Sequence, residues 1–141
     1  MDVRQFVGSF RKEKLNLMVV QGGLVVYSSR GEGLSPLIDA VGSGKGYLQD
    51  ALVIDRVVGR AAALVMCYGK SKYVFAELMS EAALQVLDVC GLDYAYERLV
   101  PRILNEDSTD LCPFEMLIEG VSDPEEGYRL ISEKVRALRT G

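Results

Sequence analysis

The sequence predicts an α/β protein, a three-layer α/β/α sandwich whose mixed five-stranded sheet is covered by helices on both faces. Apolar segments of strand length alternate with segments of helical periodicity along most of the chain. The first two strands are separated only by Gln-Gly-Gly, which favours an antiparallel hairpin, whereas later strands are each followed by a helix. The 141 residues show no repeat, linker or low-complexity stretch, so residues 1–141 are expected to form one domain.

The amino-terminal half predicts a helix, a hairpin, a second helix and a central strand. Valine and phenylalanine recur at the helical spacing in the first segment. Ser35 is expected to be the N-cap of the second helix, with Pro36 at N1. The last segment, ALVIDRVV, is apolar apart from one Asp-Arg pair, as in a buried central strand. The expected elements are a helix over 2–13, strands over 15–20 and 24–29, a helix over 35–42 and a strand over 51–58.

The carboxyl-terminal half repeats the helix–strand alternation and ends in two helices. Ser80 is a good N-cap, and Gly69 and Gly91 are typical helix ends. Acidic residues after Asp123 and basic residues near the chain end suit the dipole of a last helix. The expected elements are a helix over 61–68, a strand over 72–78, a helix over 80–90, a strand over 93–97, and helices beginning at Cys112-Pro113 and Asp123-Pro124.

Composition excludes several classes of partner. A net charge of −4 and a pI of about 4.9 argue against a nucleic-acid-binding protein, which needs clustered Lys and Arg. The longest apolar run, AAALVMCY, is far shorter than the ~20 residues that span a bilayer, so no membrane association is expected. The charged amino terminus, MDVRQFVGSFRKEK, lacks the apolar core of a signal peptide, and a cytoplasmic location is expected.

The residues that are rare or missing restrict the chemistry further. Without histidine there is no Ser–His–Asp or Cys–His pair and no histidine-ligated metal. The three cysteines, Cys67, Cys90 and Cys112, lie far apart and form no Cys-x-x-Cys, which argues against structural zinc. We expect reduced thiols, with Cys67 and Cys90 in the core because they lie within apolar helices.

Four stretches in the middle and at the end of the chain carry a family resemblance: IDRVVGRAAALVM (54–66), AELMSEAALQVL (76–87), RLVPRILNED (98–107) and LCPFEMLIEG (111–120). The first stretch contains, in this order, an aspartate, a basic residue, Val-Val-Gly, a second basic residue and three alanines. This order is typical of one protein family. The sequence is similar to domain-of-unknown-function family eighteen ninety-three, a small prokaryotic family with a cytidine-deaminase-like fold. The resemblance implies that fold and a site location, but no activity, because the family has no established reaction.

The deaminase-like fold also implies where catalytic groups would lie. Active deaminases of this fold use His or Cys with Glu at one helix start and Pro-Cys-x-x-Cys at the next, which hold a water-activating zinc ion. The matching starts here read VGRAA (58–62) and MSEAA (79–83), without zinc ligands of the right type, and Cys112 lies one strand later. Zinc-dependent deamination is therefore excluded, and neither a metal nor another cofactor is expected.

Both helix starts should open on one edge of the sheet, where α/β proteins bind ligands. Backbone N–H groups there, with the positive charge of Arg56 and Arg60, favour a phosphate or carboxylate. Structural alternatives stay open: Gly59 makes only a turn, Asp55 marks an exposed strand end, and Ser80 is a plain N-cap. The candidate ligand-binding residues are Asp55, Arg56, Gly59, Arg60, Ser80, Glu81, Asn105, Thr109 and Cys112.

Cys112 takes the N-cap place before Pro113 at N1 and Glu115 at N3. A helix N-terminus favours the thiolate, so Cys112 could act as a nucleophile with Glu115 or Asp107 as proton carrier. We favour the alternative of a buried thiol that fills a small gap, since free cysteine is among the most buried residue types. The polar run 105–110 suits either a ligand-contacting loop or an ordinary turn.

Two functions of different classes follow from these observations. The leading hypothesis is a non-catalytic, deaminase-like domain that binds a small anionic, nucleotide-like ligand in a degenerate active-site cleft, as a sensor or regulatory module. The alternative is a cysteine-dependent enzyme that uses Cys112, and a purely structural or interaction role is a third. The apolar stripe of residues 2–13 could cover its own sheet, as we expect, or a second copy in a homo-oligomer.

Overall fold

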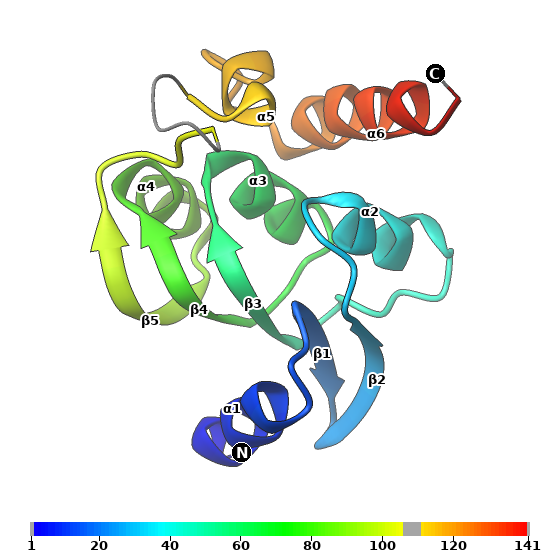
Figure 1. The fold of residues 1–141 in the computed structure, drawn as a ribbon, viewed down its shortest axis with the longest axis vertical. Helices are drawn as coiled ribbons and strands as arrows, with labels where there is room; N and C mark the ends of the chain where they lie inside the picture. The colour runs from blue at the N-terminus through cyan, green and yellow to red at the C-terminus, as the bar shows by residue number, and fades with distance from the viewer. Residues whose placement is uncertain (1, 106–110, 141) are drawn as a thin grey trace.

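A computed structural model describes residues 2–105 and 111–140 and shows a mixed five-stranded sheet in the order β2-β1-β3-β4-β5 (Figure 1). β1 runs antiparallel to both β2 and β3, whereas β3, β4 and β5 run parallel to one another. The prediction of an α/β protein with a hairpin followed by alternating helices and strands is confirmed. The strands are β1 (Leu17–Gln21), β2 (Leu24–Ser29), β3 (Leu52–Val58), β4 (Tyr73–Ser80) and β5 (Asp93–Val100).

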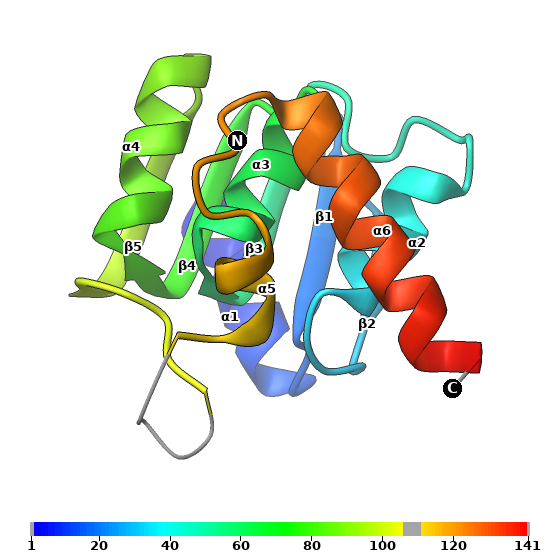
Figure 2. The same cartoon turned by 90° about the horizontal axis from the view of Figure 1, so that it is seen from above.

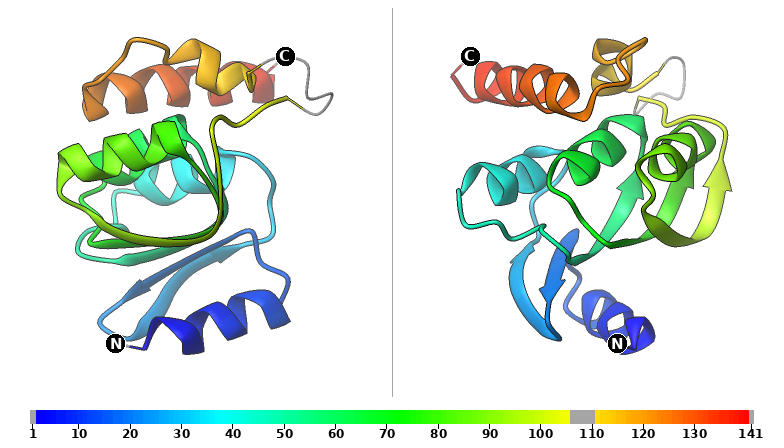
Figure 3. Two further views of the ribbon diagram at one scale, coloured as in Figure 1. Left: turned by 90° about the vertical axis from the view of Figure 1, so that its left-hand side faces the viewer. Right: turned by 180° about the vertical axis from the view of Figure 1, so that it is seen from behind.

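Helices flank the sheet on both faces, and two of them form an additional outer layer. The helices are α1 (Val3–Lys12), α2 (Ser35–Gly42), α3 (Arg60–Tyr68), α4 (Glu81–Cys90), α5 (Pro113–Leu117) and α6 (Pro124–Thr140). α1 covers one face alone, while α2, α3 and α4 cover the other (Figure 3). α6 packs on the outside of α3 and α2, so this side is one layer thicker than the predicted three-layer sandwich.

The two faces of the sheet carry separate hydrophobic cores because side chains alternate along each strand. On β3, Val53 points into the large core beneath α2, α3 and α4, whereas Leu52 and Ile54 point into the smaller core beneath α1. Phe10 of α1 is 1% exposed in that smaller core. The apolar stripe of α1 therefore covers the chain's own sheet, as expected from its spacing.

Local capping rules hold at some helix ends and fail at others. The Ser80 side chain accepts the Ala83 N–H at 3.0 Å, and Gly91 ends α4 with a left-handed φ of 74°. The prediction that Ser35 caps α2 is wrong, since Leu34 is the N-cap and Ser35 is already helical.

No helix in the described part of the chain is long and apolar enough to cross a membrane.

Two further expectations need correction. β5 extends to Val100 rather than to residue 97, because its far end pairs with β4 down to Ser80. This pairing supplies hydrogen bonds that local sequence preference does not report. The expectation that Cys90 is buried in the core is also wrong, since its side chain is exposed on the last turn of α4, while Cys67 is half-buried.

Candidate functional site

A cleft of about 750 Å³ opens at the carboxyl ends of β3, β4 and β5, the edge at which parallel strands of α/β proteins usually meet their ligands. α5 lies next to the start of α3 at this edge (Figure 2). The cleft therefore combines strand ends with a short helix from much later in the chain. Its lining residues are Asn16, Glu32, Gly33, Leu34, Asp55, Arg56, Val57, Gly59, Ala61, Ala62, Glu77, Leu78, Glu97, Arg98, Ile103, Leu104, Cys112, Phe114 and Glu115.

Asp55 is a carboxyl group of the cleft whose ionisation is altered by its surroundings. It lies near the carboxyl end of β3 and is half-buried. Burial raises the pKa of Asp55 to about 7, although backbone hydrogen bonds from Val57 and Arg56 oppose the shift. Near neutral pH this carboxyl group is therefore divided between a proton-donating and a proton-accepting form.

A chain of alternating charges forms the lip of the cleft on the α1 side. The Arg56 guanidinium lies 3.5 Å from Glu77 and donates to the Asn16 side chain at 3.0 Å. Arg11 of α1 pairs with the same Glu77 and with Glu97. These exposed pairs contribute little stability, but they separate two neighbouring carboxylates and set their orientation.

Arg98 is the guanidinium of the cleft without a comparable partner. It lies on β5 opposite Leu78 of β4, and its side chain is exposed at the cleft. No described residue forms an ion pair with it. Of the basic side chains that line the cleft, Arg98 is thus the one whose donors are available to a ligand.

Glu115 occupies the position at which the sequence predicted an anionic ligand. Its two carboxylate oxygens accept the backbone N–H groups of Arg60 and Ala61, each at 2.7 Å, and the residue is only 8% exposed. A Cβ atom at Gly59 would lie 2.7 Å from a Glu115 oxygen, so this close approach requires glycine. The anion-binding start of α3 is therefore filled by the chain's own carboxylate.

Arg60 also differs from its expected role, because it is not among the residues that line the cleft. Its guanidinium donates to the carbonyl oxygens of Ile118, at 2.6 Å, and of Val121. These carbonyls lie at and beyond the end of α5, where helix carbonyls lack partners within the helix. Arg60, the first residue of α3, thus contacts both ends of α5. Its backbone N–H donates to the Glu115 side chain in the first turn, and its guanidinium donates to carbonyl oxygens that follow Leu117.

The remaining predicted residues divide into those at the cleft and those away from it. Ser80 is fully buried as the cap of α4, and neither it nor Glu81 lines the cleft. Asn105 is half-buried and is not a lining residue, while Thr109 and Asp107 lie outside the described residues. The predicted residues that the fold brings together at the cleft are Asp55, Arg56, Gly59, Cys112 and Glu115.

Sequence reasoning missed four charged residues of the cleft. Glu77, Glu97 and Arg98 lie within strands. In the sequence each is only a charged residue inside a segment of strand propensity, which does not by itself indicate a binding site. Glu32 precedes α2 in a glycine-containing loop. Only the tertiary arrangement, which brings the ends of β4 and β5 and the loop before α2 to one edge, shows that these side chains share a site.

Cys112 takes the predicted N-cap position of α5 and lines the cleft. Its side chain caps no N–H group, whereas its own backbone N–H donates to the Ile103 carbonyl at 3.0 Å. The half-buried thiol is thus held beside the cleft by the backbone. In residues 2–105 and 111–140, no three His, Cys, Asp or Glu side chains are grouped as metal ligands.

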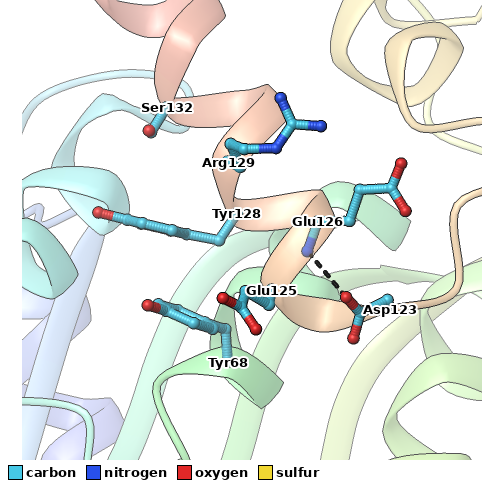
Figure 4. A pocket seen from close by; sticks show the side chains of 7 residues that line it. All are labelled: Tyr68, Asp123, Glu125, Glu126, Tyr128, Arg129 and Ser132. Atoms are coloured by element: carbon cyan, nitrogen blue, oxygen red, sulfur yellow. Dashed lines mark hydrogen bonds between the residues drawn. The ribbon is translucent and has the colours of Figure 1, made fainter.

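A second, smaller hollow of about 410 Å³ lies between the end of α3 and the start of α6 (Figure 4). The rings of Tyr68 and Tyr128 stack there with centroids 4.5 Å apart. The Asp123 carboxylate accepts the Glu126 N–H at 3.2 Å and so caps α6. These contacts account for the hollow as part of the packing of α6 on α3.

Replacing Glu115 by alanine is expected to lower the free energy of unfolding by about 2–4 kcal/mol, because one buried and one part-buried N–H group of α3 lose their acceptor. Glu119→Ala, on the exposed part of the same segment, is the matched control and should change it by less than about 0.5 kcal/mol. Urea denaturation of the three proteins measures both effects. Equal stabilities of the two variants would contradict the assigned role of Glu115.

Asp55 is expected to make the protein less stable as the pH rises from about 5 to about 7.5. Its folded pKa of about 7 exceeds the ordinary aspartate value, so the folded state binds more protons in this window and loses stability as they dissociate. No imidazole titrates here, because the chain has no histidine. The expected loss attributable to Asp55 is roughly 2–3 kcal/mol.

Urea denaturation at the two pH values tests this dependence with two amide variants. Asp55→Asn should remove the loss, whereas Glu133→Gln, which alters an exposed pair with Arg129 on α6, should behave like the wild type. An Asp55→Asn protein with the wild-type pH dependence would show that this carboxyl group titrates normally.

Comparison with known proteins places the chain in a family. The family model TM1506, described as Domain of unknown function (DUF1893), matches residues 6–135. The chain is similar to the crystal structure of a DUF1893 family protein (TM1506) from Thermotoga maritima, with 31% identity and a TM-score of 0.86 over 94% of this chain and 88% of that chain. No curated protein matches. The predicted resemblance is confirmed, and the chain belongs to the DUF1893 family.

Proposed function

We propose that this chain is a ligand-binding domain whose cleft at the ends of β3, β4 and β5 holds a small, nucleotide-like molecule with an anionic group. The observation that carries the proposal is the partly apolar cleft of about 750 Å³ in which Asp55 is a half-buried carboxyl group with a pKa near 7. Perturbed ionisable groups in a cleft are characteristic of functional sites. In this proposal the domain acts as a sensor or regulatory module.

The two halves of the proposed ligand correspond to different parts of the cleft. Val57, Leu78 and Phe114 supply apolar surface for a planar ring. Asp55 can accept from, or donate to, the polar edge of such a ring. Since Glu115 fills the start of α3, the anionic group would meet the guanidinium of Arg98 instead.

We also infer that the fold is cytidine-deaminase-like. The strand order β2-β1-β3-β4-β5, with an opening hairpin and two strand–helix units, supports this inference, and the cleft lies at the start of α3, one of the two helix starts at which deaminases of this fold carry their catalytic groups. The step from this fold to a nucleotide-like ligand is an analogy. The absence of bound zinc remains a prediction from the sequence.

A thermal-shift comparison of nucleosides with their monophosphates tests the proposed ligand. We expect a monophosphate to raise the unfolding midpoint by several degrees, since a ligand at 100 times its Kd stabilises by about 2.7 kcal/mol. Arg98→Ala should abolish the advantage of the phosphate, whereas Arg102→Ala, an exposed arginine that does not line the cleft, should keep it. No shift with any compound, or equal losses in both variants, would contradict the proposal.

A cysteine-dependent enzyme is the second candidate, favoured by the presence of Cys112 and Asp55 in one cleft. The Cys112 sulfur would bond to an electrophilic carbon while its proton passes to the Asp55 carboxylate and then to the leaving group. A carboxyl group with a pKa near 7 suits this transfer. Glu115, the proton carrier considered from the sequence, is instead committed to two N–H groups of α3.

Thiol labelling separates the enzyme from the binding domain. The enzyme requires iodoacetamide to modify Cys112 much faster than a model thiol near neutral pH, and Asp55→Asn should slow that reaction at least tenfold. The binding domain predicts that Cys112 reacts no faster than a model thiol. Mass-spectrometric time courses of the wild type and of Asp55→Asn give the rates, with the exposed Cys90 as an internal reference.

A further inference from the structure

Two cysteines outside the cleft lie on the faces that α3 and α4 present to each other. The Cys67 thiol, near the end of α3, is 4.0 Å from the Val86 carbonyl oxygen of α4. Cys90 follows Val86 by one helical turn, and side chains of a helix lean over the turn that precedes them. The Cys90 thiol therefore projects back toward the point at which Cys67 touches α4.

The packing of the two helices is close enough for their side chains to meet. α3 carries three consecutive alanines, which are all buried, and it packs directly on α4. Cys67 and Val86 are both half-buried against the large core, whereas Cys90 is exposed. One thiol of the pair is thus accessible to solutes, and the other lies behind it in the helix interface.

We propose that Cys67 and Cys90 are a redox-modifiable pair that forms a reversible disulfide between α3 and α4 when the protein meets a peroxide. The Cys90 thiol loses its proton, and its sulfur attacks one oxygen of hydrogen peroxide, so that the O–O bond breaks and a sulfenic acid forms. The departing hydroxide takes up a proton, in balance with the one that the thiol lost, and leaves as water. The Cys67 sulfur then attacks the Cys90 sulfur and loses its proton, and the hydroxyl of the sulfenic acid leaves as a second water. Two thiols lose two electrons, and the peroxide gains them.

The environment of each thiol assigns this order of events. Cys90 is exposed and can meet the peroxide directly. Burial, followed by the contact with the Cys90 thiol, raises the pKa of Cys67, so this thiol is a poor target for an oxidant in solution. It can still resolve a sulfenic acid beside it, because the local concentration of the two groups is high.

The disulfide would also change the stability of the protein in a measurable way. It would close a loop from residue 67 to residue 90 that contains β4, the strand between β3 and β5. A cross-link of this length restricts the unfolded chain and is expected to raise the unfolding midpoint by about 10 °C. The effect is independent of the cleft, so it does not rest on the proposed function.

Peptide mapping of the full chain tests the pair directly. The protein is treated with a small excess of hydrogen peroxide, alkylated with iodoacetamide and digested with trypsin without reduction. Cleavage after Arg and Lys separates the three cysteines into peptides 61–70, 73–98 and 103–129. We expect a cross-linked product of the first two peptides, a monomeric protein on a non-reducing gel, and reversal of both the cross-link and the thermal shift by dithiothreitol.

Serine variants supply the matched controls. Cys90→Ser, at an exposed position that should not affect folding, must abolish the cross-link and the thermal shift, whereas Cys112→Ser must keep both. The proposal is overturned if Cys90 stops at sulfinic acid with Cys67 still free, or if peptide 103–129 carries the main cross-link. A cross-link found only in covalent dimers would also overturn it.

Discussion

The contact between the Glu115 carboxylate and the first N–H groups of α3 is the interaction on which the rest of the site depends. A buried carboxylate is costly unless it is paired, and the helix start offers two donors and the positive end of its dipole. The same contact holds α5 at the sheet edge, with Arg60 binding carbonyls beyond the other end of that helix. One wall of the cleft is therefore built from a segment that the sheet itself does not position, and Gly59 leaves the space that makes this possible.

Filling the start of α3 from within the chain decides which chemistry remains for a ligand. The backbone N–H groups at the start of α3 are already used by Glu115. Of the two arginines among the described lining residues, Arg56 is paired with Glu77 and Asn16. Recognition would then depend on side chains at the strand ends, chiefly Asp55 and Arg98, set against apolar walls. The proposed ligand, with distinct planar and charged parts, would use both kinds of surface, whereas a simple inorganic anion would use only the charged one.

Elements that depend on short-range rules followed from the sequence almost residue by residue. Ser80 caps α4 and Gly91 ends it, because both act on backbone groups within four positions of themselves. The stripe containing Phe10 faces the sheet because helical spacing places those side chains on one side. The predicted end of β5 fell short of Val100 because the last residues of this strand are held by pairing with β4. Cys90 was wrongly predicted to be buried because an apolar helix can still leave its last turn exposed.

The sequence by itself determined the fold class, the order of the elements and the family, since periodicity, caps and the quoted motifs are all local properties. The sequence also identified Asp55, Gly59 and Cys112 as candidate site residues. Only the tertiary structure decided that Glu115 accepts the backbone N–H of Arg60, 55 positions earlier in the sequence. The same holds for the contact of Cys67 with Val86 in the neighbouring helix. Such pairs have no sequence signature, because their energy comes from groups that meet only after the sheet and its helices have packed.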